Sequence, residues 1–160
     1  MLDAGAISEE EILRAVCARL PKRLWESCGA AFAHWPDFMP VKREVCAFAA
    51  QLAQNGYKLW LCSNAGVRFS TYCHQIPVFA HFEGLLVSAF ERCVKPDPAI
   101  YQRLFEKFGL APSSCFFIDD LPVNVEGARA CGMDGHVFNG SLDNLEEALA
   151  ARGVKLPAVF

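Results

Sequence analysis

The chain has 160 residues, 53% of them hydrophobic, and its 15 basic and 18 acidic residues leave a net charge of −3. This length and composition suit about one globular domain with a core of its own and exclude a disordered chain. No run of basic residues could neutralise a nucleic-acid backbone, and no segment reaches the roughly 20 apolar residues of a membrane span, so we expect neither partner.

Two helices are the first predicted elements. Ser8 and Glu11 have the spacing of a capping box, and an apolar stripe continues the helix over residues 8–20. A second helix is predicted over residues 23–33. The cluster at residues 35–40, which contains two prolines, breaks the helical pattern, so we place a boundary there.

Strands and helices alternate along the rest of the chain. The first strand, over residues 57–62, is a short apolar run of the kind found in parallel sheets that are buried on both faces. The alternation predicts an α/β fold with a parallel sheet and helices on both faces. The predicted elements are helix 41–54, strand 57–62, helix 66–74, strand 84–88, a helix between Pro96 and Gly109, strand 115–118, helix 123–131, strand 135–138 and a last helix capped by Ser141.

Polar side chains follow predicted strands or precede a predicted helix at three places. The carboxyl ends of parallel strands meet at one edge of a sheet, so we expect these side chains to converge there. A hydroxyl donor, a cation and two carboxylates suit a phosphate ester bound beside Mg²⁺, which prefers oxygen ligands. The candidates are Ser63 with Asn64, Lys95, and the pair Asp119 and Asp120.

Each candidate also has a plainer interpretation. Ser63 could cap a helix, Lys95 could be an exposed loop residue, and the two aspartates could form a turn before the next helix. Asn124 could cap a turn, or it could orient Lys95 or Ser63. No ligand or triad spacing links the four histidines, which we interpret as structural: His34, His74, His81 and His136.

Eight cysteines sit singly within apolar stretches and show no spacing of a metal site. We interpret them as reduced core residues and therefore expect a cytoplasmic protein, with disulfide formation as the lesser alternative. They are Cys17, Cys28, Cys46, Cys62, Cys73, Cys93, Cys115 and Cys131.

Three strings, in this order, resemble motifs of the haloacid dehalogenase superfamily. Residues 59–64 look like its second motif, an apolar strand ending in Ser or Thr. Residues 94–101 resemble its third motif in the KPDPxIY form, and residues 116–133 resemble its fourth in the DDxxxN…AxxxGM form. The chain is most similar to the subgroup of bacterial sugar-phosphate phosphatases and the N-terminal phosphatase domains of bifunctional epoxide hydrolases.

The resemblance implies a Rossmann-like core with part of a small helical cap, and Mg²⁺-dependent hydrolysis of a small phosphorylated metabolite. Site roles follow from it residue by residue. They are phosphate binding for Ser63 and Asn64, charge stabilisation for Lys95, magnesium binding for Asp120 with Asp119 as a second or water-mediated ligand, and orientation of Lys95 or Ser63 by Asn124.

The first motif of this superfamily, an apolar strand ending in Asp-x-Asp, is not found in the sequence. Its first aspartate is the nucleophile and its second is the general acid and base. Asp3 is no substitute, because only two residues precede it and Gly5 stands in the second position. In relatives this strand lies between those that end at Ser63 and Asp119. We therefore expect residues 1–36 to be the remnant of a cap and residues 37–160 to be a core without its first strand.

Two consequences follow for this chain. Loss of a covalent nucleophile costs on the order of 10⁶ in rate in a serine protease, so the isolated chain should be nearly inert. A buried strand contributes on the order of 10 kcal/mol from apolar burial, while a whole domain is stable by only about 5–15 kcal/mol. We therefore expect a truncated product or fragment, which, if it folds alone, must rearrange its sheet or associate with another chain.

Two other functions fit parts of the sequence. One is a catalytically dead domain that binds a partner or a phosphorylated ligand, which becomes the better account if Met1 is the natural start. The other is a haloacid dehalogenase, which needs no metal. Relatives of that kind lack the acidic pair of the fourth motif, so Asp119 and Asp120 argue against it.

Overall fold

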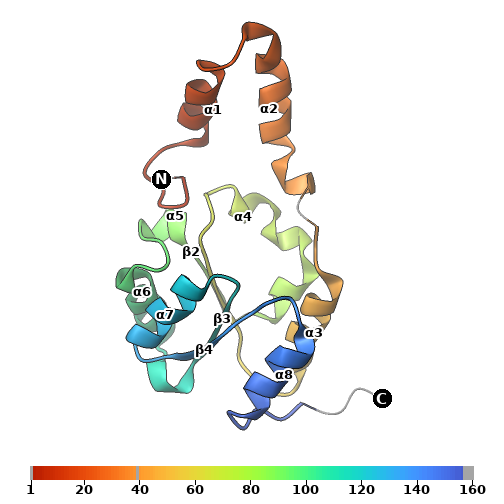
Figure 1. Ribbon diagram of the computed structural model, residues 1–160, viewed down its shortest axis with the longest axis vertical. Coiled ribbons are helices and arrows are strands. Elements are labelled where there is room, and N and C mark those ends of the chain that lie inside the picture. The colour runs from red at the N-terminus through yellow and green to blue at the C-terminus, as the bar shows by residue number, and fades with distance from the viewer. Residues whose placement is uncertain (1, 39, 157–160) are drawn as a thin grey trace.

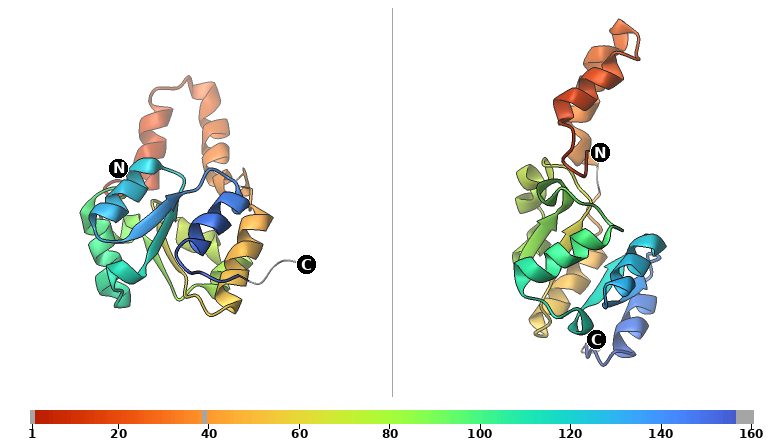
Figure 2. Two further views of the ribbon diagram at one scale, coloured as in Figure 1. Left: turned by 60° about the horizontal axis from the view of Figure 1, so that its bottom comes forward. Right: turned by 90° about the vertical axis from the view of Figure 1, so that its left-hand side faces the viewer.

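The computed structural model describes residues 2–38 and 40–156, so Met1 and position 39 of the predicted break at residues 35–40 lie outside the described residues. A helical hairpin stands at one end of an α/β body (Figure 1). Both views in Figure 2 show this hairpin projecting from the body. No helix in the described ranges has the length and apolar character that crossing a membrane requires.

The hairpin consists of α1 (Glu9–Cys17) and α2 (Trp25–Ala33), joined through the 3-10 turn η1 (Lys22–Leu24). The predicted capping box of α1 is present: the Glu11 amide donates to Ser8 Oγ at 3.1 Å, and the Ser8 amide donates to Glu11 Oε2 at 2.7 Å. α1 ends at Cys17, whereas the sequence predicted a helix up to residue 20. Pro21 disfavours a helical conformation at the residue before it.

The hairpin leads into the 3-10 turn η2 (Trp35–Phe38), which coincides with the predicted break in the helical pattern. A proline within this turn removes one backbone donor, so an α-helix cannot continue through it. The division of the chain into residues 1–36 and 37–160 stays a prediction.

The body contains four strands, all of which lie where strands were predicted or within a few residues: β1 (Trp60–Ser63), β2 (Gly84–Val87), β3 (Phe116–Asp119) and β4 (Asp134–Val137). They form two separate two-stranded parallel sheets, β1 with β2 and β3 with β4. The parallel arrangement is confirmed. A single continuous sheet is not observed, because no strand of the described residues joins β1 to β3.

Helices of the body largely follow the predicted positions, with local differences. Asp97 caps α6 by accepting from the Ala99 amide at 2.9 Å, and Gly109 ends it with a left-handed φ of 63°. The helix expected over residues 66–74 is reduced to short turns. The elements are α3 (Arg43–Gln54), α4 (Phe69–Tyr72), η3 (Cys73–Gln75), η4 (Pro77–His81), α5 (Ser88–Glu91), α6 (Pro98–Phe108), η5 (Pro112–Ser114), α7 (Pro122–Ala130) and α8 (Leu142–Ala150).

Two apolar clusters hold the body together. One joins Cys62 of β1 and Phe117 of β3 to residues of α6 and α7, and the other joins α3 to α8 beside Phe116. Neighbouring residues of a strand point to opposite faces, so Phe116 and Phe117 place these helix pairs on opposite sides of β3. Helices therefore cover both faces, as predicted, and apolar packing rather than strand pairing connects the two halves of the sheet.

Candidate active site

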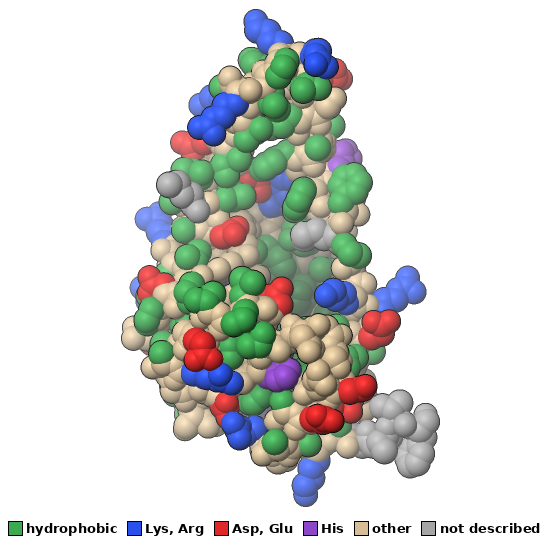
Figure 3. Space-filling view, in the orientation of Figure 1, with side chains coloured by type: hydrophobic (Ala, Val, Ile, Leu, Met, Phe, Trp, Pro, Cys, Tyr) green, Lys and Arg blue, Asp and Glu red, His purple; other side chains and the backbone are tan. Residues whose placement is uncertain are grey.

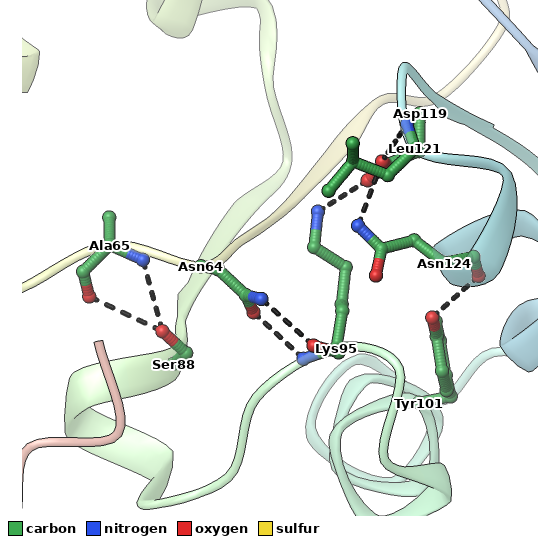
Figure 4. A network of polar contacts seen from close by, with 8 residues as sticks. All are labelled: Asn64, Ala65, Ser88, Lys95, Tyr101, Asp119, Leu121 and Asn124. Atoms are coloured by element: carbon green, nitrogen blue, oxygen red, sulfur yellow. Dashed lines mark hydrogen bonds and ion pairs between the residues drawn. The ribbon is translucent and has the colours of Figure 1, made fainter. Parts of the chain in front are cut away.

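The ends of β1 and β3 are brought together by a loop that carries Lys95 (Figure 4). Asn64 follows β1, and its side-chain amide donates to the Lys95 carbonyl at 3.0 Å. The Lys95 amide in turn donates to Asn64 Oδ1 at 2.8 Å. Because both hydrogen bonds involve the Lys95 backbone, they fix the loop and leave its ammonium group free to reach β3.

The Lys95 ammonium forms a buried ion pair with Asp119, the last residue of β3. Its Nζ lies 2.6 Å from Asp119 Oδ2, and the two side chains are only 9% and 6% exposed. Burial by itself would raise the pKa of the Asp119 carboxyl, but hydrogen bonds from Lys95, the Leu121 amide and Asn124 outweigh it and hold that pKa below its ordinary value. Asp119 is therefore kept as a carboxylate beside the Lys95 side chain.

Asn124, in the first turn of α7, supports this pair from the other side. Its Nδ2 donates to Asp119 Oδ1 at 2.9 Å, and its own carbonyl accepts a 2.6 Å hydrogen bond from the buried Tyr101 hydroxyl. The sequence left open whether Asn124 caps a turn or orients Lys95 or Ser63. In the structure its side chain contacts Asp119, the partner of Lys95, because the first turn of α7 folds back over the end of β3.

Two candidates remain unengaged. The Ser63 hydroxyl, at the end of β1, and the exposed Asp120 carboxylate make no hydrogen bond or ion pair with any part of the chain that the structure describes. Ser63 can therefore offer a donor to an anion, and Asp120 can offer both oxygens to a cation. Of the predicted residues, the structure thus joins Asn64, Lys95 and Asp119 directly.

The donors fit Mg²⁺ in kind but not in number. Within residues 2–38 and 40–156 no group of three or more His, Cys, Asp or Glu side chains could hold a metal ion. Asp119 already accepts three hydrogen bonds, which leaves Asp120 as the open carboxylate. Because Mg²⁺ is held by about six oxygen atoms, this chain supplies only part of a coordination shell.

Ser88, which was not among the candidates predicted from the sequence, fixes the backbone next to the site. It is fully buried at the start of α5, and its hydroxyl accepts from the Ala65 amide at 3.0 Å. It thereby fixes the turn that follows Asn64 (Figure 4). Its position as the polar last residue of the predicted strand 84–88 is the signal that could have identified it, since Ser63 was chosen as the polar residue at the end of an apolar run.

Comparisons with known proteins agree on one family. Residues 8–132 match the family model described as haloacid dehalogenase-like hydrolase. The chain is 28% identical over 105 residues to flavin mononucleotide hydrolase 1 of Arabidopsis thaliana, covering 66% of this chain and 42% of that protein. It is 40% identical over 57 residues to a phosphatase of Mycobacterium tuberculosis, covering 36% of this chain and 26% of that protein. The chain thus spans less than half the length of these relatives.

Among solved structures, the fold is similar to that of a haloacid dehalogenase family enzyme from Bacteroides thetaiotaomicron. That structure, an alanine variant in complex with magnesium and inorganic phosphate, has a TM-score of 0.73 at 19% identity. The alignment covers 91% of this chain and 75% of that one. At this identity the likeness establishes the fold.

Proposed function

The chain belongs to the haloacid dehalogenase-like hydrolase family, and from that premise we propose that the complete protein is a magnesium-dependent phosphatase for a small phosphorylated metabolite. The observation that carries this proposal is the buried Lys95 and Asp119 ion pair, 2.6 Å long, beside the residues that end β1. The relatives named as a flavin mononucleotide hydrolase and a phosphatase support it.

The proposed roles follow from the contacts. Ser63 donates its free hydroxyl to a phosphoryl oxygen, and Asn64 keeps the loop of Lys95 beside it. Lys95 offsets the negative charge of the phosphoryl group, which is most effective where water is excluded. Asp120 would hold Mg²⁺ through its open carboxylate, with Asp119 as a second or water-mediated ligand, and the ion when bound would neutralise and orient the phosphoryl group.

We further propose that the nucleophile is carried by another polypeptide segment, which adds a strand between β1 and β3. These strands have no hydrogen-bonded neighbour between them among the described residues, while the helices that cover them bridge both halves. A strand placed there in parallel would end at the edge where Lys95 meets Asp119. Without that segment, we expect the chain to be inactive.

The test is a polypeptide extended at its N-terminus by an apolar strand ending in Asp-x-Asp. We expect it to hydrolyse p-nitrophenyl phosphate with Mg²⁺ and to lose turnover in EDTA, and we expect the present chain to show no turnover. Ser63→Ala should lower kcat by about 10²-fold, as loss of one preorganised donor does. A folded, extended polypeptide without Mg²⁺-dependent turnover would refute the proposal.

Two alternatives give different results in that assay. A haloacid dehalogenase would release halide from a haloacid without metal, and the open carboxylate of Asp120 has no role in such a reaction. A non-catalytic binding domain would show no Mg²⁺-dependent turnover even in the folded, extended polypeptide.

A further inference from the structure

Arg68 connects the body to both helices of the hairpin. It lies in the loop of residues 64–68, which we call the β1–α4 loop, immediately after the phosphate-binding candidates. Its Nε donates to Glu9 Oε2 at 2.8 Å, and its Nη2 donates to the same oxygen. Its Nη1 donates to the Phe32 carbonyl, and its guanidinium carbon lies 4.9 Å from the centre of the Phe32 ring.

These contacts join elements that are remote in the sequence. Glu9 begins α1 and Phe32 lies in the last turn of α2, so one guanidinium holds both ends of the hairpin. A planar guanidinium can make such divergent bonds at once, whereas an ammonium group acts as a point charge. The tie therefore depends on an arginine at this position and not only on a positive charge.

Burial makes this ion pair stronger than others in the hairpin. The side chains of Arg68 and Glu9 are 26% and 24% exposed, whereas those of the ion pair between Arg14 and Glu10 are 71% and 82% exposed. Water and salt screen exposed pairs, which contribute little to stability. Loss of Arg68 should consequently matter more than loss of Arg14.

Besides the Arg68 contacts, the segment before α1 is bonded to the body, because the Ser88 hydroxyl donates to the Asp3 carbonyl. A cavity of about 560 Å³ lies between hairpin and body, and Glu9, Arg68 and Phe90 are among the residues that line it. Figure 3 shows both hydrophobic and charged side chains around the hollow below the hairpin. Because apolar packing is interrupted here, the polar contacts of Arg68 contribute more to holding the hairpin against the body.

The other end of the β1–α4 loop is fixed to the candidate site. Asn64 is bonded to the Lys95 backbone, and the Ala65 amide is bonded to Ser88. The loop is therefore held at the site by its first residues and at the hairpin by its last. Displacement of the hairpin has to strain either Arg68 or the loop that carries the phosphate-binding candidates.

We infer that Arg68 is a positioning residue that holds the hairpin in place over the β1–α4 loop, so that the hairpin and the loop move as one unit. The description of this loop as phosphate-binding rests on the proposed function, but the contacts of Arg68 with Glu9 and Phe32 do not. Hydrogen exchange can test the tie without any catalytic turnover.

The experiment measures amide hydrogen exchange by mass spectrometry in the full chain. Arg68→Gln should raise exchange in α1 and α2 roughly tenfold, since local opening is governed by the contacts that opening breaks. Exchange in α6 should stay unchanged, which reports that the body remains folded. Arg68→Lys should restore part of the protection, and Arg14→Gln, the matched control in the same hairpin, should change exchange by less than about twofold.

A double-mutant cycle identifies the partner. If Glu9 and Arg68 act through one another, the effect of Glu9→Gln combined with Arg68→Gln should be smaller than the product of the two single effects. Equal exchange in the Arg68→Gln and Arg14→Gln variants would overturn the inference. So would a rise in α6 as large as that in the hairpin, because it would mean that Arg68 stabilises the whole molecule instead of positioning the hairpin.

Discussion

Asp119 matters for stability before any question of catalysis arises. Its carboxylate faces the buried ammonium of Lys95, so Asp119→Asn should leave an unpaired charge and lower the free energy of unfolding by about 3–5 kcal/mol. Asp120→Asn is the matched control. Its side chain is exposed and unpartnered among the described residues, so the change should stay within about 0.5 kcal/mol. Urea unfolding of both variants measures the difference.

The lowered pKa of Asp119 also predicts how the unfolding free energies of the wild type and Asp119→Asn differ as pH falls. The Asp119 pKa is lower in the folded chain than the ordinary value of about 3.9, so its contribution is present above that pH and is lost as pH falls through the folded pKa. Unfolding free energy should therefore fall below about pH 4 more steeply in the wild type than in Asp119→Asn. The pKa values of Glu11 and Asp134 are also lowered, but both residues are present in the wild type and in Asp119→Asn, so they do not change the difference between the two proteins. Parallel slopes would contradict the assignment.

The position of α7 over the site depends on a glycine within that helix. A methyl group at Gly127 would lie 2.9 Å from the Pro96 carbonyl oxygen, and this backbone atom next to Lys95 cannot move freely. Gly127→Ala should therefore destabilise the chain by about 1–3 kcal/mol. At Gly29 in α2 nothing lies within 4 Å, so Gly29→Ala should stabilise by about 0.5–1 kcal/mol. Thermal unfolding of the two variants should shift in opposite directions, and a common direction would contradict the packing explanation.

Three helix starts were predictable because their signals are local. Ser8, Asp97 and Ser141 each cap a helix through a backbone group two or three residues away, and those residues identify the helix start in the sequence. The site residues at the ends of β1 and β3 were predictable for a related reason, because parallel strands present their carboxyl ends together.

Contacts between distant elements were not predictable in this way. Arg68 and Glu9 are separated by 59 residues, and nothing in the local pattern of either residue indicates the other. The sequence left the role of Asn124 open between capping a turn and orienting Lys95 or Ser63, since its contact with Asp119 depends on how α7 turns back over β3. Strand positions followed from apolar runs, whereas the division of the sheet depends on which strands pair, and pairing is a property of the whole fold.

At the scale of the molecule, the divided sheet predicts self-association. Strands whose backbone groups lack neighbours are sites at which further chains add, and Ile118 in the middle of β3 is 38% exposed. We expect the chain to form oligomers at micromolar concentration. A polypeptide extended by the additional strand should instead be monomeric and more stable. Light scattering after size-exclusion chromatography distinguishes the two states.

A charged residue on the exposed strand tests the cause of this association. Ile118→Lys should reduce oligomer formation, because lysine at a strand edge opposes the addition of a second strand. Val16→Lys is the matched control: Val16 is similarly exposed, at 41%, but lies in the hairpin. If both lysine variants reduce association equally, general surface charge explains the effect. If only Ile118→Lys does so, the contact runs through β3, and the same substitution should also oppose insertion of the strand that the proposed phosphatase requires.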